Sequence, residues 1–227
     1  MAGVVVVEMF VDISCPWCHG GLETSRRVLD ELAADPDVPS LELRWRFLRL
    51  HAMPRAGGLP IAEYFASMPG ANEDSASAMH AEVQRYATSV GVRVDQARFH
   101  YLHDPFTAHR LLAAVRDDNG DDLPSLWSLA RSIFSANFVH GVDVSDLAAL
   151  RGAVERAGLA VPRRVWTELS EGEGHHARTL ADHARALEVK LDGVPRMVID
   201  GRIVPTWVDP GDVRRDLRAA IAAATTA

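Results

Sequence analysis

The stretch DISCPWCHGG, residues Asp12 to Gly21, contains both cysteines of this 227-residue chain, Cys15 and Cys18. Two residues separate the cysteines, and His19 follows directly. Three chemistries use this spacing: a reversible disulfide, half of a zinc site, and, as C-x-x-C-H, the covalent attachment of haem. The segments around the stretch and the composition of the chain decide how it is interpreted.

The segments around the cysteines predict a strand, a helix and a second strand. Val4 to Val11 is a nearly continuous apolar and β-branched run, which is typical of a strand buried on both faces. Pro16 suits the first turn of a helix because it has no N–H to satisfy there, and an apolar stripe follows from Leu22 to Leu32. Leu41 to Phe47 then alternates apolar and charged residues. Both cysteines are therefore expected at the N-terminus of the first helix.

The rest of the chain changes character twice. From about His51 to Lys190 apolar residues recur at helical spacing and strand patterns disappear. A strand pattern returns at Val194 to Asp200, Asp200-Gly201 signals a hairpin turn, and a last helix is expected after Asp209-Pro210. This order predicts an α/β protein with a thioredoxin fold (β-α-β, then β-β-α) interrupted by a large all-helical insertion.

This prediction divides the chain into three parts. Residues 1–52 and 191–227 are expected to form the thioredoxin domain, and residues 53–190 the insertion domain.

Composition limits the classes of function. The chain is 48% hydrophobic and 24% charged, as in ordinary globular proteins, and its net charge of −7 without a basic run argues against nucleic-acid binding. No stretch approaches 18 apolar residues, so no membrane span is expected. The first residues lack a positive n-region and a cleavage site, so we expect a cytoplasmic protein. Disulfides in that compartment are mostly transient and catalytic.

The position of the cysteines favours redox chemistry. The thiolate is the form that attacks disulfides, and unpaired N–H groups together with the positive end of the dipole at a helix N-terminus stabilise an anion there. Cys15 is therefore the expected nucleophile. Cys18, one turn deeper, is the expected resolving thiol, and Pro16 and Trp17 between them are expected to tune the pair. No cofactor is expected beyond the dithiol, although a low-molecular-weight thiol is a possible co-substrate.

Four motifs extend this interpretation to a family. The chain resembles the DsbA family of thiol-disulfide oxidoreductases in the thioredoxin superfamily, and within it the cytoplasmic FrnE-like subgroup. The resemblance covers nearly the whole chain. It rests on D-x-x-C-P-W-C (Asp12 to Cys18), A-H-R-L (Ala108 to Leu111), F-x-x-N-F-x-x-G-x-D-V-S-D (Phe134 to Asp146) and G-V-P (Gly193 to Pro195).

The resemblance implies the second half of the site. Pro195 is expected to be cis and its loop to pack against the cysteines, whereas a trans proline at the start of an edge strand is the alternative. Val194 is expected to offer its backbone groups to an extended substrate. Expected partners are protein or small-molecule thiols and disulfides, and an unidentified thiol reductant or oxidant.

Several residues depart from the family pattern. His19 replaces an aromatic residue; it either favours the thiolate when protonated or faces solvent. Arg196 either places positive charge near Cys15 and acidic substrates, or points away. Met9 occupies the position of a buried acid that serves many relatives as a proton acceptor, which leaves Asp12 as a helix cap, a proton relay or a plain strand-end cap. His51 to Pro54 departs from an expected asparagine-proline pair.

Rival functions remain open. Haem attachment requires an exporting, oxidising compartment, and a structural zinc site requires ligands beyond the two cysteines and His19. Kappa-class glutathione transferases and 2-hydroxychromene-2-carboxylate isomerases resemble the same layout, with a serine where Cys15 stands here. A binding module without activity is a third class. Two cysteines favour an oxidoreductase.

Overall fold

The structure is a computed structural model that describes residues 4–50, 57–68, 70, 72, 74–118, 123–172, 174–204 and 209–225. His51 to Pro54 lies outside these residues. The elements in chain order are β1 (Val5–Val11), α1 (Pro16–Ala33), β2 (Leu41–Phe47), β3 (Leu59–Pro60), α2 (Ile61–Ala66), α3 (Ser75–Val90), β4 (Tyr101–Leu102), α4 (Phe106–Asp118), α5 (Leu123–Phe138), α6 (Leu147–Arg156), α7 (Arg163–Glu171), α8 (His176–Glu188), β5 (Arg196–Ile199), β6 (Arg202–Ile203) and α9 (Pro210–Thr225).

A four-stranded mixed sheet with the order β2-β1-β5-β6 forms the centre of the fold. β1 runs parallel to β2, with Val7 opposite Leu43, and antiparallel to β5, with Met9 opposite Met197. β5 and β6 form the hairpin expected at Asp200-Gly201. β1 is buried almost throughout because it lies between two strands and under helices on both faces, which confirms the interpretation of its apolar run.

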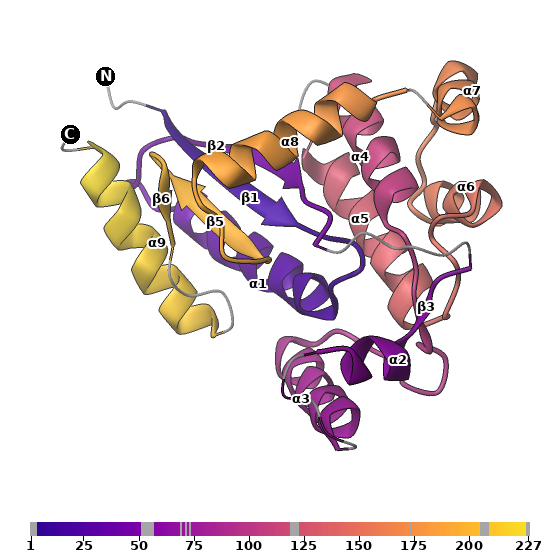
Figure 1. The fold of residues 1–227 in the computed structure, drawn as a ribbon. Coiled ribbons are helices and arrows are strands. Elements are labelled where there is room, and N and C mark those ends of the chain that lie inside the picture. Colours follow the sequence, from indigo (N-terminus) through magenta and orange to yellow (C-terminus); the bar gives the residue numbers. More distant parts are fainter. Residues whose placement is uncertain are drawn as a thin grey trace.

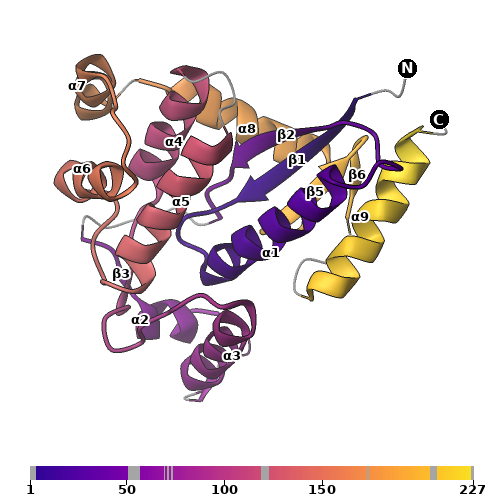
Figure 2. The ribbon, with the colours of Figure 1, turned by 180° about the vertical axis from the view of Figure 1, so that it is seen from behind.

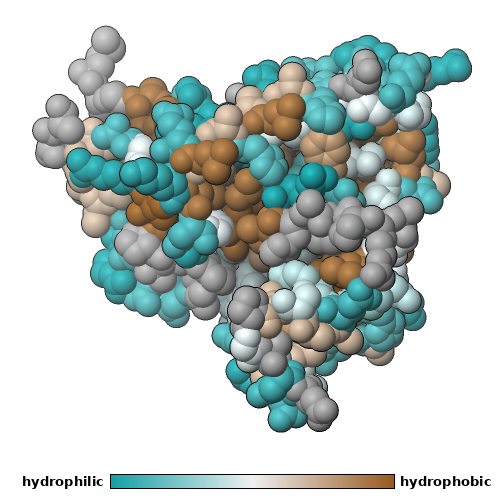
Figure 3. All heavy atoms as spheres, in the orientation of Figure 1, coloured by the Kyte–Doolittle hydropathy of each residue, from teal (hydrophilic) through white to brown (hydrophobic). Residues whose placement is uncertain are grey.

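Helices cover both faces of this sheet. α1 and α9 pack against one another on one face, and α9 also contacts β1 and β5. α8 lies across the opposite face, where it contacts β2 (Figures 1 and 2). Figure 3 shows hydrophobic side chains on the outward side of α8; Leu180 and Leu187 of this helix are 54% and 80% exposed. Among the described residues, no helix combines the length and the apolar character needed to cross a membrane.

The inserted segment is mostly helical, as predicted, but it is not all helical. β3 and β4 pair as a small antiparallel ladder, with Leu59 opposite Leu102. Two residues are too few to produce an alternating pattern, which is why the sequence did not predict these strands. The division at residues 52 and 190 stays a prediction. α8, the last helix before the second boundary, contacts both β2 of the sheet and α4 of the insertion.

The hydrophobic core continues from the sheet into the insertion. Trp45 on β2 meets Trp127 on α5 edge to face, with ring centroids 4.8 Å apart. Phe134 and Phe138 of α5 are fully buried and belong to the same cluster as the strands. Trp127, Phe134 and Phe138 are therefore core residues. The shared core holds the insertion against the end of the sheet from which the cysteine-bearing loop leaves β1 (Figure 1).

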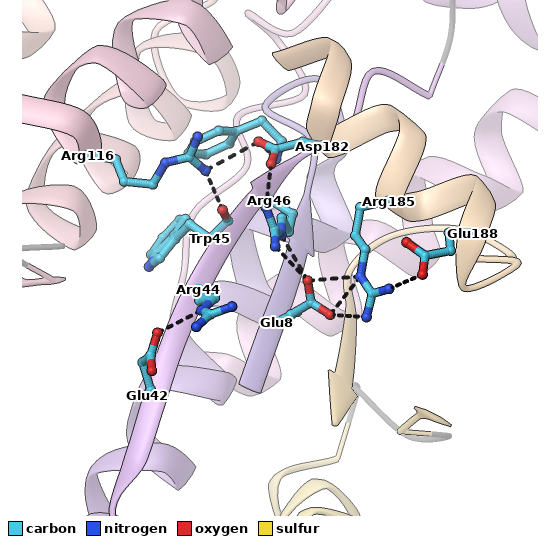
Figure 4. A network of polar contacts seen from close by, with 10 residues as sticks. Glu8, Glu42, Arg44, Trp45, Arg46, Arg116, Asp182, Arg185 and Glu188 are labelled. Carbon is cyan, nitrogen blue, oxygen red and sulfur yellow. Dashed lines mark hydrogen bonds and ion pairs between the residues drawn. The ribbon is translucent and has the colours of Figure 1, made fainter. Parts of the chain in front are cut away.

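A buried ion network crosses the face of the sheet beneath α8 (Figure 4). Glu8 of β1 accepts hydrogen bonds from Arg46 of β2 (2.8 Å) and Arg185 of α8 (2.7 Å). Asp182 of α8 accepts from Arg46 and Arg116. Burial alone would raise the pKa of Glu8, but the hydrogen bonds from Arg185 and Arg46 lower it below its ordinary value of 4.5. The network therefore ties β1, β2, α4 and α8 together.

We expect Glu8→Gln to lower the free energy of unfolding at pH 7 by about 2 kcal/mol, because it leaves Arg46 and Arg185 without their shared carboxylate. The folded-state pKa of Glu8 lies below the unfolded value, so its contribution is present above pH 4.5 and is lost as pH falls through the folded pKa. Urea unfolding at several pH values tests this. The free energies of unfolding of the native protein and the variant should become equal in acid. A difference that does not change with pH would contradict this role of Glu8.

Candidate active site

Both cysteines are free thiols at the start of α1. Cys15 is the N-cap residue of this helix, with an extended backbone and Pro16 as the first helical residue. The side chain of Cys15 is 7% exposed, whereas Cys18 is fully buried. The backbone N–H of Cys18 donates to the carbonyl of Cys15 (3.0 Å). The structure thus places one nearly buried thiol at the helix end and the second one turn deeper, as the sequence predicts.

Cys18 lies in surroundings that disfavour its charged form. Burial raises the pKa of the Cys18 thiol well above its usual range, and the neighbouring Cys15 raises it further. The backbone N–H of Asp12 donates to Sγ of Cys18 (3.4 Å) and opposes this effect only in part. Cys18 is therefore a protonated thiol near neutral pH, which suits a resolving group that reacts second.

The loop before β5 faces Cys15. The Cys15 thiol donates to the carbonyl oxygen of Val194 (3.8 Å), and the Val194–Pro195 peptide bond is cis. The Arg196 guanidinium, by contrast, lies against Asp192 at 3.0 Å and also donates to the carbonyl of Pro195 (3.2 Å). The Asp192 carboxylate therefore balances the charge of Arg196.

Gly20 and Gly21 are site residues that the sequence pattern did not reveal. A β-carbon on Gly21 would lie 2.6 Å from Cγ of Pro195, and one on Gly20 would lie 2.5 Å from the ring of Tyr86 on α3. Both distances are far too short for carbon atoms. Each glycine inside a helix lowers helix stability by about 1 kcal/mol relative to alanine. Two in succession therefore indicate that other parts of the chain pack closely against α1 here. Because Gly21 has no side chain, Pro195 can pack against α1 there, and Tyr86 packs against α1 at Gly20 for the same reason.

Asp12 holds the loop between β1 and α1, and it does not cap the helix. Its carboxylate accepts from the backbone N–H groups of Ser14 and Leu50, both at 2.8 Å, and lies 3.4 Å from Nε2 of His109. Burial alone would raise the pKa of Asp12, but its surroundings, which include the backbone N–H groups of Leu50 and Ser14, lower it. The helix-cap alternative for Asp12 is therefore wrong, because Cys15 occupies that position. Its role in proton relay stays a prediction.

The insertion clamps the peptide groups of Ile13, two residues before Cys15. Nε2 of His109 on α4 accepts from the N–H of Ile13 (3.2 Å), and Nδ2 of Asn137 on α5 donates to its carbonyl (3.1 Å). Both side chains are about 1% exposed. They belong to the A-H-R-L and F-x-x-N-F segments, whose role spacing alone did not reveal. The clamp fixes the loop that carries the nucleophile.

We expect Asn137→Ala to lower the free energy of unfolding by about 1–3 kcal/mol, because it leaves the buried carbonyl of Ile13 without a donor. Ser132→Ala on the same helix is the matched control: the Ser132 hydroxyl is buried and has no hydrogen-bond partner among the described residues. The control should change stability little or raise it. Equal losses for both variants in urea unfolding would show that Asn137 does not act through Ile13.

His19 matches neither sequence-based alternative. Its side chain is 6% exposed, and its ring stacks on Phe134 and Phe138 with centroids 5.3 and 5.9 Å away. Burial, with a smaller contribution from Arg131, lowers the pKa of His19 to about 4. The imidazole is therefore neutral at pH 7, and the electrostatic role expected of a protonated His19 does not apply at that pH.

An apolar pocket of about 240 Å³ opens beside Cys15. Trp17, Gly193 and Val194 line it on the side of the sheet. The inserted segment completes the wall with mainly apolar side chains, among them Tyr64, Phe65, Met68, Met79, Val83 and Phe99. Trp17 also packs against Tyr86, with ring centroids 5.0 Å apart. The pocket can therefore receive an apolar group next to the Cys15 sulfur.

Metal chemistry finds no support within the described part of the chain. No three histidine, cysteine or acidic side chains there are placed to hold a metal ion. His19 turns into the aromatic core, away from a shared ligand set with the cysteines. The arrangement instead offers a dithiol, a carbonyl beside the first thiol and an apolar pocket.

Comparison with known proteins identifies the family. The sequence pattern described as a DSBA-like thioredoxin domain matches residues 6–218. The chain belongs to this family. No curated protein sequence matches the chain. The DsbA-like fold agrees with the α/β thioredoxin architecture expected from the order of the elements.

Solved structures support the same fold. A "probable DsbA oxidoreductase" from Streptomyces coelicolor is 24% identical, with a TM-score of 0.79 over 96% of this chain and 90% of that one. The cytosolic disulfide reductase DsbM from Pseudomonas aeruginosa, solved with GSH, is 15% identical, with a TM-score of 0.66 over 96% and 99%. A 2-hydroxychromene-2-carboxylate isomerase is 17% identical, with a TM-score of 0.56 over 96% and 95%. At these identities the likeness concerns the fold, which both activities use.

Proposed function

We propose that the protein is a thiol-disulfide oxidoreductase in which Cys15 and Cys18 exchange a dithiol for a disulfide. One observation carries this proposal: Cys15 at the N-terminus of α1 borders an apolar pocket, and a second free thiol, Cys18, is buried one turn behind it. Membership of the DsbA-like family supports it. No cofactor beyond the dithiol is required, and a low-molecular-weight thiol can act as co-substrate.

The reaction runs in two exchanges. The Cys15 thiolate attacks one sulfur of a substrate disulfide; the S–S bond breaks, and the other sulfur leaves as a thiolate. Cys18 then loses its proton and attacks the sulfur of Cys15, which releases the second substrate thiolate and leaves the Cys15–Cys18 disulfide. The substrate gains two electrons and two protons. The reverse sequence oxidises a dithiol.

Substrate positioning falls to Val194 and the apolar pocket. The carbonyl of Val194 lies within reach of the Cys15 sulfur and can accept an N–H from an extended substrate. An apolar side chain next to the substrate cysteine fits among the pocket residues. A thiol reductant or oxidant in the cytoplasm, the compartment expected from the sequence, completes the cycle.

The second candidate is a glutathione-dependent transferase or isomerase. The fold likeness to 2-hydroxychromene-2-carboxylate isomerase and the small pocket favour it. In that case the glutathione thiol would react and Cys18 would be dispensable. Parallel assays distinguish the two: disulfide reduction with a thiol reductant, and glutathione-dependent isomerisation or conjugation. Disulfide exchange that requires both cysteines supports the oxidoreductase, and isomerisation that survives Cys18→Ala supports the alternative.

A further inference from the structure

A second cavity, of about 1040 Å³, lies between α1 and α5. Figure 2 shows both helices on the side that faces the viewer. The residues that line this α1–α5 groove come from one face of each helix, from the segment after α3, and from the end of α6. Cys15 is not among them; it lines the smaller apolar pocket. The groove is therefore separate from the dithiol site, although His19 of the active-site helix forms part of its wall.

The groove carries an excess of positive charge. Four arginines and two acids line it: Arg26, Arg93, Arg131, Arg156, Glu23 and Asp30. Arg131 pairs with Glu23 at 2.7 Å and Arg26 with Asp30 at 2.9 Å. Arg93 and Arg156 are exposed, and neither has a carboxylate within ion-pair distance in the part of the chain that the structure describes. A chain with a net charge of −7 thus presents a locally cationic groove.

The groove has the dimensions and polarity of a peptide site. Its α1 wall extends from His19 to Asp30, about 16 Å at 1.5 Å per residue, which matches about five residues of extended chain. Ser128 and Ser135 line the α5 wall about two helical turns apart and add to its polar surface. The carboxylates of Glu23 and Asp30 are paired with Arg131 and Arg26, and their remaining lone pairs can accept peptide N–H groups.

From these features we propose that the α1–α5 groove binds a short acidic segment of a partner protein in extended conformation, with its carboxylates paired to Arg93 and Arg156. This proposal does not depend on the direction of thiol exchange. Docking there would bring the partner onto the outer face of the helix that carries Cys15 and Cys18.

Fluorescence anisotropy with fluorescein-labelled hexaglutamate tests the proposal at low ionic strength. The double variant Arg93→Glu/Arg156→Glu should bind at least about tenfold more weakly than the native protein, because two attractive contacts become repulsive. Arg163→Glu/Arg202→Glu changes the net charge equally at exposed arginines outside the groove, and this control should bind within about twofold of native.

His19 provides an independent readout because it is one of the groove-lining residues and lies on the same face of α1 as Glu23 and Arg26. At pH 7, NMR spectra should show that hexaglutamate shifts the backbone amide signal of His19 in the native protein and not in the groove variant. Absence of saturable binding, equal weakening in both double variants, or equal affinity for a hexathymidine oligonucleotide or for citrate would overturn the proposal.

Discussion

Replacing Cys15 by serine is expected to reduce disulfide exchange to the rate measured without protein. A serine hydroxyl is not ionised near neutral pH and cannot form the mixed disulfide, so both exchanges fail. The variant should fold normally, because the change replaces one atom of a side chain that is 7% exposed. Turnover of a fluorescent disulfide substrate with excess dithiothreitol measures the loss after subtraction of the background rate.

Cys18→Ser is the matched control for this experiment. Cys15 can still attack in this variant, but no resolving thiol remains, so the mixed disulfide should accumulate. Intact-mass analysis should show a mass increase equal to the attached substrate thiol, and the increase should disappear on reduction. Undiminished turnover in Cys15→Ser, or the absence of an adduct in Cys18→Ser, would contradict the proposed roles.

Gly21→Ala is expected to lower both activity and stability. The new methyl group would lie 2.6 Å from Cγ and 3.1 Å from Cβ of Pro195, a rigid ring that cannot turn aside. The loop that places the Val194 carbonyl beside Cys15 must therefore shift. Overpacking of this kind costs about 1–3 kcal/mol, and a displacement of about 1 Å at a reacting group can cost about a hundredfold in rate. Turnover and urea unfolding measure the two effects.

Gly20→Ala separates the two effects in Gly21→Ala. The three atoms nearest to its methyl group, 2.5–2.9 Å away, would all belong to the side chains of Tyr86 and Val90. We expect a loss of stability that is comparable to that of Gly21→Ala, with a much smaller loss of turnover. If both variants lose turnover equally at matched stability, the contact between Gly21 and Pro195 does not position the site.

Patterns within single elements were predictable from the sequence. The apolar run of β1, the alternation in β2 and the Asp200-Gly201 turn each report on the burial of one strand or hairpin. Pro16 after Cys15 located the start of α1. These signals are local, because the period of a helix or strand depends on neighbouring residues. The resemblance to the family then placed Pro195 with the cysteines.

Contacts between distant segments were not predictable from the sequence. The clamp on Ile13 joins residues about a hundred positions apart, and the burial of His19 depends on two aromatic rings of α5. Neither arrangement produces a periodic pattern in the sequence. The role of Glu8 became visible only in the structure, where α8 places Arg185 beside its carboxylate. Tertiary packing therefore decided which polar residues serve structure and which face the thiols.

The reduction potential of the Cys15–Cys18 pair decides between the two candidate functions. The protein is equilibrated in glutathione buffers of defined ratio, free thiols are trapped by alkylation, and mass spectrometry counts them. We expect a reversible two-electron couple confined to these two cysteines. A potential of about −270 mV would indicate a reductant, and one between about −120 and −200 mV an oxidant or isomerase. A pair that forms no reversible disulfide in any buffer would contradict the oxidoreductase and leave the glutathione-dependent alternative.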